Sequence, residues 1–183
     1  MHFSVARATS DGLLVAVHRK VEGVDDVDCF VLAASKNWLL LKEADALRPD
    51  GFWVFRMDKV ISLQRSRFHE FKQRMMKLSG LLKGLRAGAG IDLTDIHTIL
   101  RWFVKRKRLC ILFTENKKEW WRLHCAIAGA TQKELKLVPF DGAGRWEKVK
   151  SSGRWIPKAI TAIRFDSHYL RLYEEHAEIG RGS

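Results

Sequence analysis

Residues 53–71 read Trp-Val-Phe-Arg-Met-Asp-Lys-Val-Ile-Ser-Leu-Gln-Arg-Ser-Arg-Phe-His-Glu-Phe, and a similar pattern of residue types returns at 155–173. In both stretches a glycine precedes an aromatic-rich segment, apolar residues then stand three apart, and a Ser-x-aromatic triplet follows. The apolar pairs are Val60 with Leu63 and Ile160 with Ile163. A repeat of this kind predicts that the chain consists of two similar halves.

The composition supports two small folded cores. Of the 183 residues, 46% are hydrophobic and seven are Trp, which is enough to fill two halves of about 80–90 residues each. No apolar run approaches the ~18 residues that a spanning helix needs, and the N-terminus lacks the pattern of an export signal. We therefore expect a cytoplasmic protein with no membrane partner.

The pattern of apolar and turn-forming residues predicts five short strands in each half, the density of a small barrel. In the first half the predicted strands are 13–19, 29–34, 38–42, 52–57 and 60–64, with residues 22–28 as a solvated acidic loop. In the second half they are 109–114, 120–128, 135–140, 154–156 and 160–165, followed by a short helix at about 167–178. The expected fold class is mainly β with helices (α+β), arranged as two small barrels in tandem.

Between the two sets of strands, the apolar period changes from two to about 3.6, which predicts two amphipathic helices. The first helix would place Phe68, Phe71, Met75, Leu78 and Leu82 on its inward face. The second would begin after Asp92 as N-cap and bury Leu93, Ile96, Leu100 and Phe103. The predicted organisation is a barrel at 1–67, a basic helical connector at 68–108 and a second barrel at 109–183.

Two groups of residues resemble known families. Residues 140–146, Phe-Asp-Gly-Ala-Gly-Arg-Trp, together with the Trp155 to Tyr169 segment, resemble uncharacterised bacterial proteins with small Sm-like or SH3-like barrels. Residues 37–40 and 55–60 resemble the WYL domain, a Sm-like module of bacterial regulators and defence proteins. Leu39 stands where that domain usually has Tyr, so its form of ligand binding is not expected here. The Sm-like resemblance implies nucleic-acid binding or protein assembly.

The net charge of +12 is concentrated in the connector. Residues 65–108 hold twelve Lys/Arg and three Asp/Glu, whereas residues 1–64 have a net charge of −1 and residues 109–183 of +4. Cations near aromatic side chains suit single-stranded nucleic acid. We predict that RNA, another polyanion or a nucleotide binds through Arg65, Arg67, Lys72, Arg74, Arg101, Lys105, Arg106, Lys107, Arg108, Trp120, Trp121 and Arg122.

Other functions are weighed against this prediction. The alternative is a protein-interaction or homo-oligomeric assembly module with a regulatory or defence role, in which the basic face is only solvated surface. An enzyme is not expected, because Glu70, Asp95 and His97 stand at unremarkable spacing without a nucleophile or a phosphate-loop motif. Cys29, Cys110 and Cys125 lie in apolar strand patterns and match no metal-ligand spacing, so we expect buried free thiols, no metal and no cofactor.

Overall fold

A computed structural model describes residues 2–20, 26–85, 90–115, 120–147, 150–151 and 156–176. The chain divides into two compact units, Met1–Leu93 and Thr94–Ser183. The two amphipathic helices between the predicted barrels therefore lie in different units, the first helix in the first unit and the second helix in the second.

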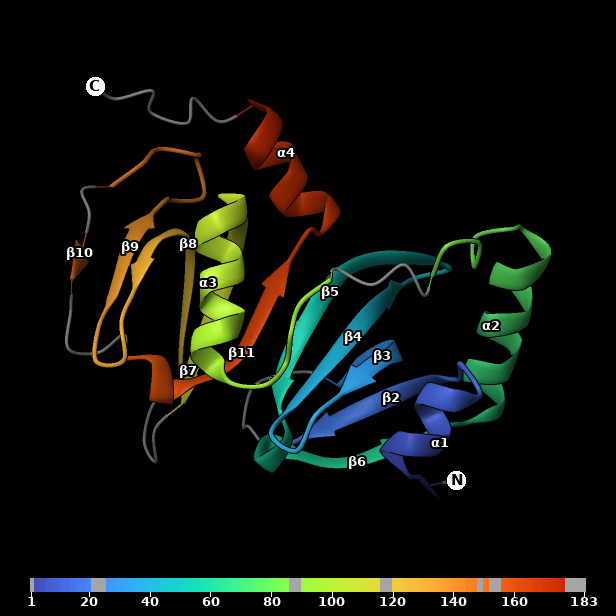
Figure 1. The fold of residues 1–183 in the computed structure, drawn as a ribbon. Coiled ribbons are helices and arrows are strands. Elements are labelled where there is room, and N and C mark those ends of the chain that lie inside the picture. Colours follow the sequence, from blue (N-terminus) through green and yellow to red (C-terminus); the bar gives the residue numbers. More distant parts are fainter. Residues whose placement is uncertain are drawn as a thin grey trace. The chain divides into compact units, whose positions relative to one another are not determined.

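The first unit is an antiparallel sheet with two helices (Figure 1). Its elements are β1 (His2–Phe3), α1 (Val5–Ser10), β2 (Leu14–Arg19), β3 (Val27–Ala34), β4 (Trp38–Asp45), β5 (Arg48–Arg56), the 3-10 turn η1 (Met57–Lys59), β6 (Val60–Gln64) and α2 (Arg67–Leu78). Within this unit the strand order is β1-β6-β2-β3-β4-β5. Helix α1 contacts β3, and α2 contacts β2.

The second unit repeats this arrangement with a helix before the first strand. Its elements are α3 (Ile96–Arg106), β7 (Leu109–Glu115), β8 (Trp120–Ala130), β9 (Leu135–Pro139), β10 (Lys150–Ser151), the 3-10 turn η2 (Pro157–Ala159), β11 (Ile160–Phe165) and α4 (His168–His176). The strand order is β11-β7-β8-β9-β10, and α3 lies against this sheet (Figure 1).

The last long strand of each unit, here called its closing strand, pairs with an earlier strand of that unit in the same way. The pairs are β6 with β2 and β11 with β7. Leu63 of β6 lies opposite Val17 of β2, and Ile163 of β11 lies opposite Leu112 of β7. Each pairing has a bulge one residue into the closing strand, because the ladder passes from residue 60 to 62 and from 160 to 162. Apart from β1, the two units thus have the same strand order, a 3-10 turn before the last long strand and a bulge at the corresponding position.

The strands nevertheless do not form closed barrels. The antiparallel sheet is not closed, and within the first unit β1 and β5 lie at opposite ends of the strand order. The structure therefore shows a mainly β fold with four α-helices in the described ranges. The predicted strand at 154–156 is also wrong at Ile156, which immediately precedes η2, and residues 154 and 155 lie outside the described ranges.

The cores are apolar, and the three cysteines lie in them. Cys29, Cys110 and Cys125 are free and buried, as the sequence predicts. Burial raises the pKa of the Cys29 and Cys110 thiols well above the usual value. Cys110 and Cys125 are direct partners in the β7–β8 ladder. The Cys29 and Cys110 thiols are therefore neutral, and all three buried cysteines pack as small apolar groups.

Helix α2 has the opposite orientation to the one that its apolar pattern predicts. Phe68, Phe71 and Leu78 were expected to face the core, but they are 61%, 55% and 73% exposed. The buried residues are instead His69, Lys72 and Met76. Both sets have helical spacing, so the apolar period alone did not determine which face would be buried.

Polar contacts to β3 and β4 explain this orientation. Asp28, which the sequence predicts in a solvated acidic loop, lies in β3 and accepts hydrogen bonds from His69 Nε2 (3.0 Å) and Lys72 Nζ (2.9 Å). Lys72 Nζ also donates to the Ala44 carbonyl oxygen, at 2.8 Å. A buried ammonium group without these partners would be unstable, so the ion pair holds Lys72 on the inner face. Met76 completes that face within an apolar cluster that includes Leu14.

Candidate nucleic-acid interface

Helix α3 carries a basic face in the second unit. The Asp95 carboxylate caps the helix by accepting a hydrogen bond from the Thr98 backbone N–H, at 2.8 Å. Its apolar side buries Ile99, Leu100 and Phe103. The Phe103 ring lies 5.1 Å from that of Phe165 on β11. Apolar burial therefore fixes which side of α3 is exposed.

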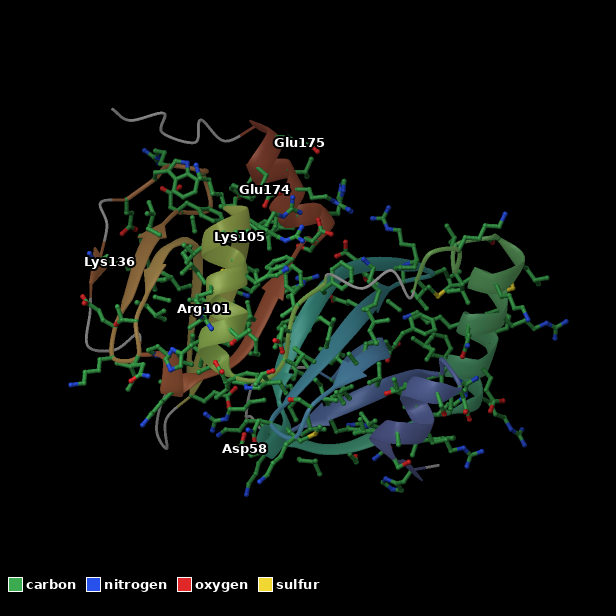
Figure 2. The ribbon with its side chains drawn as sticks, in the orientation of Figure 1. Asp58, Arg101, Lys105, Lys136, Glu174 and Glu175 are labelled. Carbon is green, nitrogen blue, oxygen red and sulfur yellow. The ribbon has the colours of Figure 1, made fainter. Side chains whose placement is uncertain are left out.

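Helix α3 and its C-cap carry four exposed cations. Arg101 and Lys105 stand one turn apart (Figure 2), and Arg106 and Lys107 are also exposed. No Asp or Glu occurs between residues 96 and 107. In the described part of the chain, none of the four cations forms an ion pair with a carboxylate. These cations can therefore contact phosphate without first breaking an internal ion pair.

The C-terminal end of α3 has a defined local structure. The Arg106 guanidinium lies over the Trp102 ring, and its Cζ is 4.9 Å from the ring centroid. Lys107 ends the helix in the left-handed conformation, with φ of 51°. Lys105 and Arg106 lie in the last turn, where the helix dipole favours positive charge.

Arg108, which follows this face, has a different role. Its guanidinium pairs with Asp166 and, at 3.2 Å, with Glu174 on α4. Glu174 also accepts a hydrogen bond from the Leu109 backbone N–H, at 2.9 Å. Arg108 therefore links the start of β7 to α4, and two carboxylates balance its charge.

Arg65 and Lys72 also form internal contacts. Arg65 Nη1 donates to the Leu14 carbonyl oxygen (3.0 Å) and to Gln73 Oε1 (2.7 Å). Lys72 is buried against Asp28, as described above. These two cations stabilise the packing of α2 in the first unit. In contrast, Arg67 and Arg74 are exposed on the outer side of that helix.

Arg122 lies on β8 beside an aromatic group that the sequence analysis did not assemble. His124, Phe140 and Tyr169 belong to this group, with ring centroids 5.6 Å apart for both His124–Phe140 and His124–Tyr169. Tyr173 joins it 4.8 Å from Tyr169 and donates its hydroxyl to the Gly142 carbonyl oxygen at 2.7 Å. Phe140 and Tyr169, which lie in the two segments that carry the resemblance, thus meet around His124.

The electrostatics of this aromatic group favour neutral side chains. Burial, assisted by the positive charge of Arg122, lowers the pKa of His124. Burial and a hydrogen bond with Tyr173 raise the pKa of Tyr169 to about 12. The group therefore carries no charge of its own at neutral pH, and Arg122 is the exposed cation beside it.

Trp120 and Trp121 are placed only through their backbone. Trp120 pairs with Glu115 and Trp121 with Thr114 at the start of β8. Their side chains lie outside the described part of the structure.

Arg122 and α3 lie on opposite faces of the sheet. Cys125 pairs with Cys110 and Cys110 pairs with Phe165, so these residues share the face on which Phe103 packs. Arg122 and His124 lie on the other face of β8, so Arg122 faces away from that side.

One further constellation was not expected from the sequence. Ser66 Oγ lies 2.8 Å from His69 Nδ1, while His69 Nε2 contacts Asp28. The order Ser-His-Asp is that of a hydrolytic triad, but His69 Nδ1 also accepts the Ser66 backbone N–H at 3.0 Å. Together with the Lys72 ion pair, this geometry describes a capped helix N-terminus that is fixed to β3.

Two of the three residues considered for acid–base chemistry, Asp95 and Glu70, have structural contacts as well. Asp95 caps α3, and Glu70 lies 3.8 Å from Arg65. Within the described ranges, no three His, Cys, Asp or Glu side chains gather as a metal site requires. Nor does any helix in those ranges combine the length and apolar composition that crossing a membrane requires.

Comparison with known proteins gives no match: no protein family, no curated protein and no solved structure corresponds to this chain.

Proposed function

We propose that this protein binds RNA, or another polyanion of the same charge density, through the outer face of α3. The observation that carries this proposal is the set of four exposed cations, Arg101, Lys105, Arg106 and Lys107, on a helix without acidic residues. Cations on a rigid helix lose little backbone freedom on binding phosphates, and the counterions of the phosphates are released.

The charge distribution supports the same proposal. The α3 face lies in the 65–108 segment that holds twelve of the protein's 33 Lys and Arg residues. Three of those twelve, Arg65, Lys72 and Arg108, form internal contacts to acceptors within the protein. They support the fold, and we remove them from the set of binding residues. The proposal therefore rests on the exposed cations and not on the total charge.

The test is a fourfold variant of the α3 face, Arg101→Gln, Lys105→Gln, Arg106→Gln and Lys107→Gln. Binding of a fluorescently labelled, unstructured RNA would be followed by anisotropy over a range of salt concentrations. Four lost phosphate contacts would lower the slope of log affinity against log salt by up to about three, at ~0.7 per contact for a single strand. The melting temperature should change little, because none of the four side chains is buried.

A matched control removes the same amount of charge elsewhere. The variant Lys36→Gln, Lys133→Gln, Lys136→Gln and Arg171→Gln also loses four exposed cations. It should retain most of the salt-dependent affinity if the α3 face is the site. Equal loss in the two variants would show that only net charge matters, and unchanged binding by the α3 variant would overturn the proposal.

We further propose that the two units descend from one duplicated, Sm-like ancestor. Support comes from the shared strand order, the 3-10 turn before each closing strand and the bulges at residues 61 and 161. Bulges re-aim a strand and are retained as designed features, so their recurrence at one position favours common origin. A crystal structure in which the two units fail to superpose on these strands would exclude it.

A further inference from the structure

The outer side of α2 carries an apolar stripe, formed by Phe68, Phe71 and Leu78 and extended by Leu81 in the following turn. Their exposed fractions are 61%, 55%, 73% and 43%. Single exposed apolar residues are ordinary, but here four lie along one helix and its next turn as an apolar patch. Such a patch marks a surface that another phase or molecule covers.

The inner contacts of α2 prevent the helix from rolling to bury this stripe. Lys72 is held by Asp28 and the Ala44 carbonyl oxygen, and Gln73 Oε1 accepts the Leu14 backbone N–H at 3.0 Å. Gln73 Nε2 donates to the Gly12 carbonyl oxygen, at 2.9 Å. A rotation that buried Phe71 would expose or break these bonds and leave buried polar groups without partners. The outward orientation is therefore a property of the fold.

Exposed cations border the stripe. Arg67, Arg74 and Lys77 are exposed on α2 and have no ion pair with a carboxylate in the described part of the chain. The one acid on the helix, Glu70, lies near Arg65. The stripe is thus apolar along its middle and positive at its rim, which is complementary to a surface that is apolar beneath and negative above.

We propose that the α2 stripe docks on the surface of an anionic phospholipid bilayer, with Phe68, Phe71 and Leu78 at the level of the acyl chains and the three cations at the phosphates. An amphipathic helix that presents Phe and Leu opposite a fixed polar side, with Lys and Arg at the boundary, has the composition of interfacial membrane helices. The helix would lie on the membrane and not cross it, so this binding does not conflict with the finding that no helix in the described ranges could span a bilayer.

Charge and shape disfavour the other occupants. A second copy placed across a two-fold axis would bring like charges of Arg67, Arg74 and Lys77 together. RNA bases could stack on Phe68 and Phe71, but the aliphatic Leu78 and Leu81 offer no stacking surface. A single convex helix also suits a planar bilayer better than a partner helix, which usually binds in a groove.

The experiment measures co-sedimentation of the full chain with vesicles. One set contains phosphatidylcholine alone, and the other contains equal parts phosphatidylcholine and phosphatidylglycerol. The parent protein should sediment with the anionic vesicles and remain in solution with the neutral ones. Phe71→Ser with Leu78→Ser should weaken anionic binding at least about tenfold, because both apolar side chains lose their burial in the bilayer.

Two further variants make the result specific. Ile61→Ser removes an equally exposed apolar residue (65%) from β6 and should leave vesicle binding unchanged. Arg67→Gln, Arg74→Gln and Lys77→Gln should weaken binding about fivefold for each cation removed. Melting curves would confirm that each variant is folded.

Three outcomes would overturn the proposal. They are failure of the parent to sediment with anionic vesicles, an equal loss of binding in the Ile61→Ser control, and a dimer that becomes monomeric in the Phe71→Ser, Leu78→Ser variant. The last outcome, detected by light scattering, would assign the stripe to a second copy. RNA binding by the same stripe variant is measured separately and should be retained, so this proposal and the α3 proposal can fail independently.

Discussion

Helices α2 and α3 have similar lengths and similar amphipathic sequences, yet they present opposite faces to their sheets. Helix α3 buries Ile99, Leu100 and Phe103 and exposes its cations. Helix α2 buries His69 and Lys72 with Met76 and exposes its phenylalanines. The difference shows that one buried ion pair to a distant strand can outweigh an apolar stripe in deciding how a helix packs.

The physical reason is the set of polar groups that each orientation of the helix would leave without partners. If α2 turned its phenylalanines inward, Asp28 would remain on β3 without His69 and Lys72. That orientation would leave a partly buried carboxylate without its partners and would also break the Gln73 bonds to Leu14 and Gly12. Together these losses reach several kcal/mol, the scale of the gain from burying the apolar stripe. On α3, by contrast, the rings of Trp102 and Phe103 both pack on Phe165, so apolar packing decides its orientation.

The largest expected effect compares the same substitution in the two helices. Phe103→Ala should destabilise the second unit by about 3–5 kcal/mol, because the ring is buried against Phe165 and its removal leaves a cavity. Phe71→Ala should change the stability of the first unit by less than about 0.5 kcal/mol, because its side chain is mostly exposed. Urea denaturation would measure both changes.

Urea denaturation monitored by one probe in each unit would show which of the two units a substitution destabilises. If Phe71→Ala proved as destabilising as Phe103→Ala, the outward position of the α2 stripe would be wrong. The comparison between the helices would then have to be abandoned.

The second prediction removes the carboxylate that orients α2. Asp28→Asn should destabilise the first unit by about 3 kcal/mol, because Lys72 remains buried without its counter-charge. Replacing both residues, as Asp28→Asn with Lys72→Met, should recover much of that loss, since the buried charge is then gone. A double-mutant cycle in urea measures the coupling, and additive effects would mean that the pair does not determine the packing of α2.

The third prediction concerns the pH dependence of the same pair. Burial alone would raise the pKa of Asp28, but hydrogen bonds from Lys72 and His69, together with the positive charge of Lys72, outweigh it and lower the pKa below its ordinary value of 3.8. The unfolded chain therefore takes up this proton at higher pH than the folded chain does. The stability that Asp28 contributes is fully present above about pH 4 and is lost as the pH falls through its folded pKa.

Urea denaturation of the parent and of Asp28→Asn over a range of pH would check this sign. The difference in stability between them should be constant near neutral pH and shrink below about pH 4. A difference that grew on acidification would mean that the pKa of Asp28 is raised in the folded protein.

The smallest expected effect tests the start of α3. Asp95→Ala should cost about 1 kcal/mol, because the Thr98 backbone N–H loses its hydrogen-bond acceptor. Asp95→Asn should retain most of that stability, since an amide oxygen also caps a helix. Thermal denaturation of the two variants separates the cap from a general effect of charge. Equal loss in both would show that the carboxylate charge, rather than the hydrogen bond, stabilises the helix.

Much of the fold follows from local sequence signals. The predicted strand at 60–64 coincides with β6, the one at 160–165 with β11, and most others differ from the structure by a few residues at their ends. The short β1 and α1 were not predicted, because two residues and one and a half turns give too little periodicity. Turn residues and strand-length apolar runs are local, and local signals predict elements well.

The orientation of α2 and the assignment of its cations depended on distant residues. Lys72 looked like a surface cation until Asp28, 44 positions earlier in the chain, was placed beside it. Arg108 likewise pairs with Asp166, and that contact spans 58 positions. Helical periodicity cannot show such contacts, so the sequence identified the basic α3 face correctly as exposed but could not separate binding cations from structural ones.

The closing strands have a consequence for the order in which the protein forms during synthesis. Leu112 pairs with Ile163, so β7 has to wait for about fifty further residues before its neighbour β11 leaves the ribosome. During that interval one edge of β7, whose residues are nearly all buried in the folded protein, lacks a partner. The partly synthesised β7–β8–β9 segment is therefore the state in which the nascent chain is most exposed to wrong strand pairing. Pairing of β11 with β7 ends that exposure.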